Sequence, residues 1–485
     1  MRISKHQQAR LNPIMCGEPC RYSERKNKMA IVRPFNGMRF TEKAGDIKEL
    51  CCPPYDIVSE EERKALVKKN PHNVIRLELP GEKGDKYKKA KELLDKWLED
   101  GTLATDENPC FYVYEERFTV GDRERSFKGI IAKVHLYDFE RGIILPHEQT
   151  LSKAKEDRFN LMQETACNFS QVYALYDDEA GKIDKSIERI SSRKPDQSFT
   201  DDAGVTHSLW VVPRCTEIDK ISANMAGKKL YIADGHHRYE TALKYRDTLR
   251  EQGVISEFGD FEQDYIMMML VNMHSNGLVV FPTHRIVHGI EGFSANSVVR
   301  ACSDIFDTGT TKSAETASQK LKGIYDKGET GFCMYDGKKY ILMKLKEDAD
   351  VKELMKDSSD ALRKLDVSVL QKLVFERVMG IDAESVANGT NISYTRDIGE
   401  AVAAVDNGEA NCCFLLNPTR VEEIAEVARA GEKMPQKSTY FYPKLITGLV
   451  MNKLDRVKED KNDDNNGEQV KKADYVGPEA EICDM

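Results

Sequence analysis

The feature that most constrains the fold of this chain is the segment 229–243, where a short apolar strand passes through one glycine into an amphipathic helix. Residues 230–233 are apolar and flanked by charge, as in a buried strand. A helix is expected from His237 to about Gln252, with its apolar residues on one stripe. Gly235 tolerates backbone angles that other residues resist and lets a ligand approach the main chain. A strand that turns directly into a helix is typical of an α/β fold.

The first turn of this helix has an unfavourable charge. His236, His237 and Arg238 place up to three positive groups where the helix dipole is already positive. A bound anion would reverse the sign of each of these contributions. The pattern therefore predicts a phosphate held by backbone N–H groups, by a bidentate Arg238 and by imidazole donors. Gly235 would permit its close approach.

Asp234 ends the strand and is the carboxylate best placed for Mg²⁺, which uses few protein ligands. Two other interpretations stay open. Asp234 could simply cap the helix while the histidines are solvated. Alternatively, Asp234, His236 and His237 could bind a transition metal, although adjacent helical histidines point about 100° apart and chelate one ion poorly.

Other periodic segments extend the pattern to a mixed α/β sheet protein. Residues 59–69 predict a helix in which Ser59 and Glu62 form a capping box. Residues 86–99 predict a second helix with one apolar face. Strands at 111–118 and 127–137 flank a turn at Gly121 and predict an antiparallel hairpin. Further strands are expected at 142–145, 172–176, 209–212, 265–271, 278–281, 331–335 and 340–345, and further helices at 155–164, 318–325 and 367–379.

At 485 residues the chain is long enough for two or three domains. We expect a disordered extension at 1–28, a core at 29–292 that carries the glycine turn, a second α/β lobe at 293–453 and a disordered polar tail at 454–485. The basic and aromatic run at 437–442 is unusual for a linker and could close over the site.

Charge and cysteine content restrict the partners and the location. A net charge of −9 argues against nucleic acid, because affinity for a phosphate backbone needs a basic face. The sequence contains no run of about 18 apolar residues, so no membrane span is expected. The twelve cysteines do not follow the spacing of disulfides or zinc sites, which indicates a reducing cytoplasm. The sequence leaves a homodimer open.

The segment 230–239 resembles the phosphate-binding box of the ParB/sulfiredoxin superfamily, and within it is most similar to the free serine kinase branch. From about Met29 to Val450 the chain also resembles the bacterial and archaeal family called domain of unknown function 1015 (DUF1015). The stretches that carry this second resemblance are 53–56, 70–77, 145–150, 157–158, 281–285 and 434–441. The resemblance implies a ParB/sulfiredoxin-like nucleotide-binding core with an additional α/β lobe.

The resemblance also implies the ligands of the site. Superfamily members bind nucleotide phosphates at this turn, so we expect ATP or ADP with Mg²⁺ at Asp234. The residues that would contact the nucleotide are Gly235, His236, His237 and Arg238, together with Arg158 from the helix at 155–164. As part of a charge run, Arg158 could equally lie on a solvated helix face, paired with Asp157.

The kinase relatives use a glutamate in a strand-to-helix loop as general base, and Glu148 occupies such a loop. Glu148, Asp234 and His237 are therefore the expected catalytic residues. The expected contacts to a small polar metabolite with a hydroxyl group, such as free L-serine, are His147, Thr150, Asn168 and Ser170. Glu148 or Thr150 could instead cap the following helix.

Three other functions remain open at this point. A nucleotide-binding sensor with little or no phosphotransfer would need the glycine turn but not Glu148. A partition-type DNA binder lacks support, since no helix-turn-helix tract is recognisable. A sulfiredoxin-like reductase would need a reactive cysteine beside the turn, and the nearest cysteine in sequence is Cys215.

Overall fold

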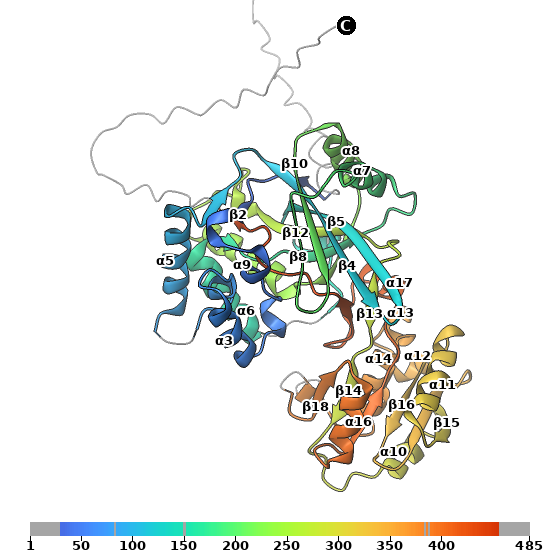
Figure 1. Cartoon of the computed structure of the whole chain (residues 1–485). Coiled ribbons are helices and arrows are strands. Elements are labelled where there is room, and N and C mark those ends of the chain that lie inside the picture. Colours follow the sequence, from blue (N-terminus) through green and yellow to red (C-terminus); the bar gives the residue numbers. More distant parts are fainter. Residues whose placement is uncertain (1–29, 82–83, 149–151, 383–384, 387–388, 455–485) are drawn as a thin grey trace, which may run out of the picture.

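The computed structural model describes residues 30–81, 84–148, 152–382, 385–386 and 389–454. It has two lobes, and each is built around a sheet with helices (Figure 1). The sheet of the first lobe is mixed and that of the second lobe is antiparallel. The mixed α/β class expected from the sequence is confirmed. Within the described ranges, no helix is both long enough and apolar enough to cross a membrane.

The first lobe contains a sheet of nine strands among the described residues, in the order β6-β11-β8-β12-β5-β4-β10-β9 with β1 paired to β5. The pairs β11–β6 and β12–β8 are parallel and the remaining pairs are antiparallel. The strands are β1 (Val32–Arg33), β4 (Cys110–Val120), β5 (Arg123–His135), β6 (Ile144–Leu145), β8 (Val172–Tyr176), β9 (Gln197–Thr200), β10 (Thr206–Pro213), β11 (Leu230–Asp234) and β12 (Tyr265–Asn272).

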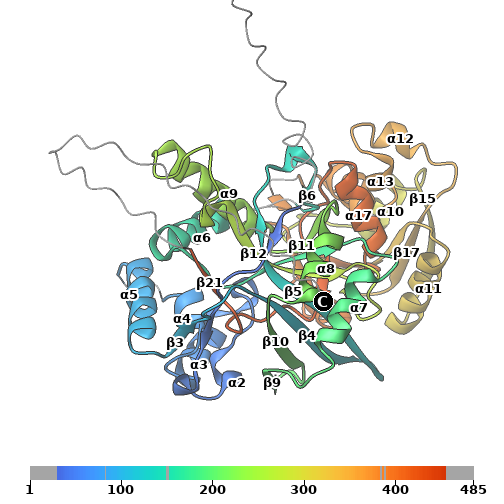
Figure 2. The ribbon, with the colours of Figure 1, turned by 90° about the horizontal axis from the view of Figure 1, so that it is seen from above.

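Helices cover one face of this sheet. Along β4 and β12 successive side chains point to opposite faces, so Val113 and Met268 join one core while Tyr112 and Met267 join the other. The first core is closed by α6 (Ser152–Thr165), α7 (Lys182–Ile190), α8 (Thr216–Met225) and α9 (His236–Glu251). In Figure 2, α6 lies beside α9 and α7 beside α8, as their contacts require.

A third core holds the N-terminal part of the first lobe. It packs α5 (Lys86–Glu99) against the short elements α2 (Ile47–Leu50), α4 (Ile75–Glu78), β2 (Met38–Phe40) and β3 (Leu103–Thr105), with α3 (Glu60–Lys69) at its edge. Ser59 and Glu62 form the expected capping box, and α5 has the expected bounds.

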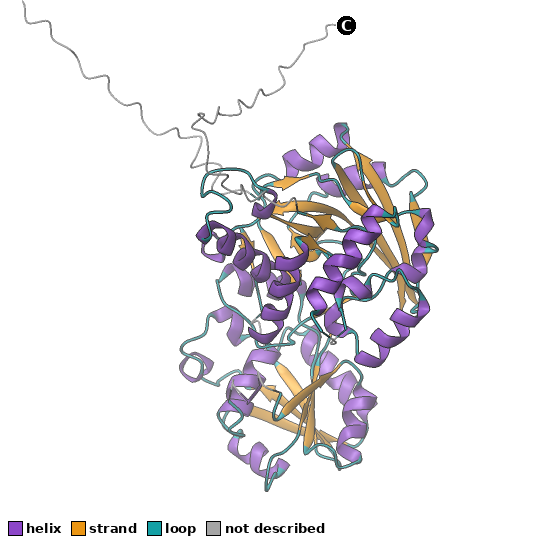
Figure 3. Ribbon diagram, turned by 90° about the vertical axis from the view of Figure 1, so that its left-hand side faces the viewer, coloured by secondary structure: helices purple, strands orange, loops and turns teal. Residues whose placement is uncertain are grey.

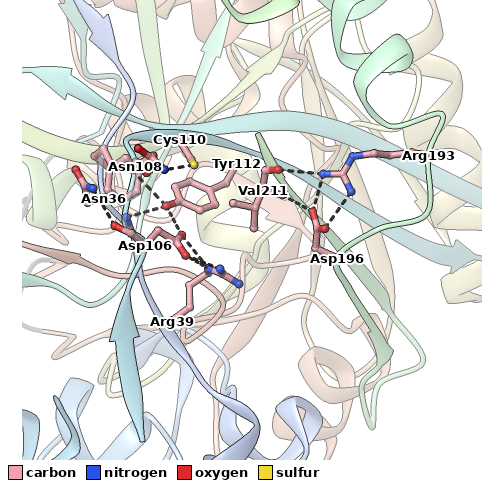
Figure 4. A network of polar contacts seen from close by, with 11 residues as sticks. Asn36, Arg39, Asp106, Asn108, Cys110, Tyr112, Arg193, Asp196 and Val211 are labelled. Carbon is pink, nitrogen blue, oxygen red and sulfur yellow. Dashed lines mark hydrogen bonds and ion pairs between the residues drawn. The ribbon is translucent and has the colours of Figure 1, made fainter. Parts of the chain in front are cut away.

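One polar network ties this N-terminal part to the main sheet (Figure 4). Arg39 Nε donates to Asp106 Oδ2 at 2.9 Å, and the Tyr112 hydroxyl donates to the same carboxylate at 2.7 Å. The Gly37 N–H in turn donates to that hydroxyl at 2.7 Å. Because Tyr112 belongs to β4, the network joins β2 to the central hairpin.

The second lobe has a six-stranded sheet, counted over the described part of the chain, in the order β15-β17-β16-β19-β14-β18. Figure 3 shows helices on both sides of it. The strands are β14 (His284–Val287), β15 (Phe306–Thr311), β16 (Gly331–Tyr335), β17 (Tyr340–Leu345), β18 (Ile392–Thr395) and β19 (Cys412–Leu415). The helices are α10 (Ala295–Ala301), α11 (Ala314–Asp326), α12 (Val351–Leu354), α13 (Asp360–Arg363), α14 (Asp366–Val369), α16 (Ile398–Asp406) and α17 (Val421–Arg429). The segment η5 (Leu370–Glu376) is a π-helix, where the sequence predicted ordinary helix.

The chain crosses between the lobes differently from the boundaries expected at 292 and 453. Strand β14 pairs with β18 and β19 and so belongs to the second lobe, although it precedes residue 293. After α17 the chain returns to the first lobe. There β20 (Tyr440–Tyr442) pairs with β13 (Val279–Phe281), and β21 (Asn452–Lys453) pairs with β7 (Cys167–Asn168). This return brings the end of the described chain against the sheet that carries the glycine turn.

Candidate functional site

The expected strand, glycine turn and helix are β11, Gly235 and α9. Gly235 has φ 87° and ψ 26°, a left-handed conformation that a side chain would strain. A Cβ atom at this position would lie 2.9 Å from Arg238 Nε, so the Arg238 side chain would have to shift. No side chain caps the start of α9, and its first turn holds no acidic residue. The backbone N–H groups at the start of this helix therefore have no side-chain acceptor at the N-cap.

Asp234 is clamped between two cations. Lys444 Nζ donates to its Oδ1 at 2.9 Å, and Arg238 donates to its Oδ2 at 3.1 Å. A second Arg238 nitrogen donates to the Gln171 carbonyl. Burial alone would raise the Asp234 pKa, but Lys444 and Arg238 outweigh it and hold this pKa well below its ordinary value. Asp234 is therefore a carboxylate throughout the neutral range.

Lys444 is the site residue that the sequence argument missed. It lies 210 positions after Asp234, on the segment that returns from the second lobe. Asp234 raises the Lys444 pKa against the effect of burial, so the ammonium stays charged. The available signal was the basic and aromatic run at 437–442, which ends just before this lysine.

The histidines of the turn are neutral, which corrects the expectation of up to three positive groups. Burial, followed by repulsion from His147, lowers the His236 pKa well below its ordinary value. Burial also lowers the His237 pKa. His236 Nε2 accepts a hydrogen bond from the His147 N–H at 3.3 Å, so this nitrogen is not the donor we expected. Arg238 is the permanent positive charge of the first turn.

His147 is fully buried and bound on both ring nitrogens. Nδ1 donates to the Ile232 carbonyl at 2.6 Å, and Nε2 accepts from the Thr439 hydroxyl at 3.0 Å. Burial lowers its pKa to about 4. Its ring also meets that of His236 edge to face, with centroids 4.7 Å apart. His147 thus positions the loop beside the turn, instead of offering a ring nitrogen to a substrate as expected.

Glu148 follows His147 directly and so lies beside the turn. Its Oε1 accepts from the Lys437 N–H at 2.6 Å, and its backbone forms a parallel bridge with Met434. Burial raises the Glu148 pKa above its ordinary value, with Lys437 acting in the opposite direction. The expected substrate contact Thr150 lies outside the described residues.

Arg158 is not on a solvated helix face. Its guanidinium donates to the Glu78 carbonyl at 2.6 Å and to Asp157 at 3.1 Å, and it lies 4.2 Å from the centre of the Tyr55 ring. These partners offset the cost of burying the Arg158 guanidinium, so its side chain can point inward. Ser170 donates to Glu78 at 2.9 Å. Glu78, Arg158 and Ser170 line a cavity of about 40 Å³ together with Asn168 and Arg238.

Asn168 has a structural role in addition. Its Oδ1 accepts from the Met267 N–H and from Asn452 Nδ2, each at 3.2 Å. The small cavity therefore brings together Arg158, Asn168, Ser170 and Arg238, four of the expected site residues. Its volume is far below that of a nucleotide site.

The donors at the turn fit magnesium only in company with phosphate. Within the described ranges, no cluster of three or more histidine, cysteine or acidic side chains could hold a metal ion. Asp234 offers one carboxylate, and both of its oxygens face cations. Magnesium commonly binds one or two carboxylates and completes its shell with water and substrate phosphates, so Asp234 is compatible with it on those terms.

Comparison with known proteins identifies a family but no activity. A family model described as "Protein of unknown function (DUF1015)" matches residues 32–368. No curated protein matches the chain. Among solved structures, a conserved hypothetical protein from Pyrococcus furiosus is 14% identical with a TM-score of 0.32, and the match covers 66% of this chain and 94% of that one.

Two further solved structures have similar scores. A free serine kinase in complex with AMP is 14% identical with a TM-score of 0.33, and the match covers 67% of this chain and 91% of that one. SbnI from Staphylococcus aureus, with a C-terminal truncation, is 11% identical with a TM-score of 0.32, covering 65% and 85%. At these scores the likeness assigns no activity to this chain.

Proposed function

This chain belongs to the DUF1015 family of proteins of unknown function, and we propose that it binds ATP or ADP at the turn of residues 234–238 and transfers a phosphoryl group to the hydroxyl of a small polar metabolite. The observation that carries the proposal is the start of α9. An uncapped helix N-terminus follows a left-handed glycine, and Arg238 and Lys444 lie at its entrance. Backbone N–H groups and the helix dipole at such a terminus favour an anion.

The cations of the site suit a phosphate chain. Arg238 and Lys444 both donate to Asp234. Each cation has further N–H groups, so a phosphate group could accept one hydrogen bond from each while Asp234 keeps its own. If Mg²⁺ accompanies the nucleotide, Asp234 would hold it and the ion would neutralise charge on the phosphates. The neutral His236 and His237 add no repulsion to that ion.

Glu148 supplies the base that phosphoryl transfer needs. The acceptor oxygen attacks the terminal phosphorus, the bond from that phosphorus to the bridging oxygen breaks, and the nucleotide leaves with one phosphate fewer. The acceptor proton passes to Glu148, whose raised pKa makes it a stronger base than an ordinary glutamate. Free L-serine is the first acceptor to test.

A nucleotide sensor is the second candidate, and one observation favours it. Glu148 Oε1 is already bound to the Lys437 N–H, and Arg238 is bound to the Gln171 carbonyl. A protein that only binds nucleotide would need the phosphate contacts without releasing Glu148 from Lys437.

The experiment that separates these functions measures nucleotide consumption by the full chain. ATP and ADP are assayed separately with Mg²⁺ against a panel of hydroxyl-bearing metabolites that includes L-serine. Turnover that depends on one acceptor supports the kinase and identifies its substrate. Tight nucleotide binding without acceptor-dependent turnover supports the sensor instead.

The phosphate site itself is tested by Arg238→Ala. Loss of a charge-assisted hydrogen bond to phosphate should weaken nucleotide binding by about 2–3 kcal/mol. The matched control is Arg300→Ala, which removes an arginine from α10 in the second lobe. Equal nucleotide affinity in Arg238→Ala and the control would refute a phosphate site at this turn.

A further inference from the structure

A second cavity lies in the other lobe. Its volume is about 110 Å³. Its described lining comes from residues 355–362, the α14–η5 helical segment, Val386 and residues 433–436. We call residues 433–439 the strap. In Figure 1, α14 lies where the two lobes meet. At about 30 Å³ for each water in the liquid, this volume corresponds to roughly four waters. This is the size of a small metabolite and well below that of a nucleotide.

The π-helix shapes the polar part of this cavity. In an α-helix, residues five apart lie about 140° apart around the axis and cannot meet. The wider turn of η5 brings Gln371 and Glu376 onto one face, where Gln371 Nε2 donates to Glu376 Oε1 at 3.2 Å. Both side chains line the cavity. Because π-helices are rare and occur frequently at functional sites, this local geometry indicates more than packing.

The lining has the chemistry of an amino-acid site. It contains one carboxylate, Glu376, whose Oε2 accepts from Lys372 Nζ at 2.8 Å. A second ammonium group, Lys433, lies 4.0 Å from Glu240 of the first lobe. The Ser368 hydroxyl, in a residue that is 2% exposed, has no hydrogen-bond partner among the described residues. The apolar side of the lining consists of Met355, Leu362, Val386 and Pro435. A zwitterion with a short aliphatic side chain would match the carboxylate, the ammonium groups and the apolar surface together.

We propose that this cavity binds a small α-amino acid with a short aliphatic side chain, and that the strap links its occupancy to the 234–238 turn. Glu376 would exchange Lys372 for the ligand's ammonium group, and Lys433 would receive the ligand's carboxylate. The binding claim is independent of the proposed function, and only the linkage rests on it.

The strap provides the physical link because its two sides have different partners. Pro435 and Gln436 line the cavity. In the same segment the Met434 N–H donates to the His147 carbonyl at 2.7 Å, and the Lys437 N–H donates to Glu148 at 2.6 Å. A ligand that shifts the strap therefore changes the hydrogen bonds that hold His147 and Glu148.

Arg285 anchors the strap from the second lobe. It is 4% exposed and donates to the Thr283 carbonyl and, at 3.3 Å, to the carbonyl of Lys437. The backbone of Lys437 therefore joins the two lobes. Its carbonyl accepts from Arg285 of the second lobe, and its N–H donates to Glu148 of the first lobe.

The binding test is calorimetric titration of the full chain, without nucleotide, with glycine, L-alanine, L-valine and L-leucine separately. We expect saturable binding of at least one aliphatic member, weakened at least about tenfold by Glu376→Gln and by Lys433→Gln. The matched control is Glu347→Gln, an exposed glutamate of the same lobe that does not line the cavity. Thermal unfolding checks that each variant is folded.

Two results would overturn the binding claim. The first is no saturable heat up to about 10 mM ligand, beyond any affinity of useful size. The second is binding that neither Glu376→Gln nor Lys433→Gln weakens. Binding that Arg238→Ala abolishes while Glu376→Gln preserves it would assign the ligand to the first lobe and would also overturn the claim.

The linkage has its own readout. Hydrogen exchange at the amides of residues 434 and 437 should slow or quicken when the amino acid binds, and nucleotide affinity should change about fivefold or more. Amino-acid binding with unchanged exchange at both amides would overturn the linkage and leave the binding site standing. Failure of nucleotide binding in every variant would count against the proposed function alone, since the titration contains no nucleotide.

Discussion

Replacing Lys444 by methionine tests the pair that closes the site, because it keeps an unbranched side chain and removes the charge. The Lys444 side chain is 10% exposed and that of Asp234 is 20% exposed, so the substitution leaves a mostly buried carboxylate short of one partner. Removing one partner of a buried ion pair costs about 3–5 kcal/mol. Arg238 still pairs with Asp234 at 3.1 Å, which reduces our expectation to about 2–3 kcal/mol in the free energy of unfolding.

The assay is urea unfolding at neutral pH, with Lys453→Met as the matched control. Lys453 lies on the same returning segment and pairs with Asp95 at 3.5 Å, but both side chains are about a third exposed or more. Surface pairs of this kind contribute about 0–1 kcal/mol. The same Lys444→Met protein should bind ATP or ADP about 10- to 100-fold more weakly, since a charge-assisted bond to phosphate is lost.

One result would refute this reasoning. If Lys444→Met lost no more stability than Lys453→Met, the carboxylate of Asp234 would not depend on the buried pair. A double-mutant cycle with Asp234→Asn isolates the pairwise energy, because the two groups are in direct contact.

Three further predictions concern the same site. Glu148→Gln should lower acceptor-dependent turnover about 10²-fold with nucleotide affinity unchanged, whereas Glu156→Gln, an exposed change on α6, should alter neither; normal turnover in Glu148→Gln would remove it as the base. Gly235→Ala should lose more stability than Gly142→Ala in urea unfolding. Both glycines have positive φ (87° and 63°), so each substitution costs about 1–2 kcal/mol of strain. Only at Gly235 would the new Cβ also meet another group, at 2.9 Å. Burial lowers the His147 pKa from 6.5 to about 4, so its contribution is present above pH 6.5 and is lost as pH falls towards 4, by up to about 3 kcal/mol. Urea unfolding at several pH values measures this loss, which His147→Gln should reduce; an identical pH profile in that variant would contradict it.

Local signals in the sequence were sufficient wherever neighbouring residues decide the structure. Caps, turns and apolar periodicity predicted four such features. These are the Ser59–Glu62 capping box, the bounds of α5, the hairpin of β4 and β5, and the bounds of β16 and β17. The glycine turn belongs to this class as well, since a strand, a glycine and a helix are contiguous. The family assignment also rested on contiguous motifs, and the family model confirms it over residues 32–368.

The π-helix η5 and the crossing points between the lobes could not be predicted in this way. A helical apolar pattern is the same for α and π turns, so residues 370–376 read as ordinary helix. The placement of β14 in the second lobe depends on pairing with β18 and β19, which lie more than a hundred residues later. Strand partners at such separation leave no local mark on the sequence.

The sequence by itself determined the turn and its residue types, and the tertiary structure decided their charges and partners. Asp234 and Arg238 are close because they lie on adjacent turns of one segment, but Lys444 reaches Asp234 only through the return of the chain from the second lobe. His236 and His237 were expected to add positive charge to the turn, but burial in the fold lowers the pKa of both. Protonation and long-range pairing depend on what surrounds a group in space, and that is known only once the chain has folded.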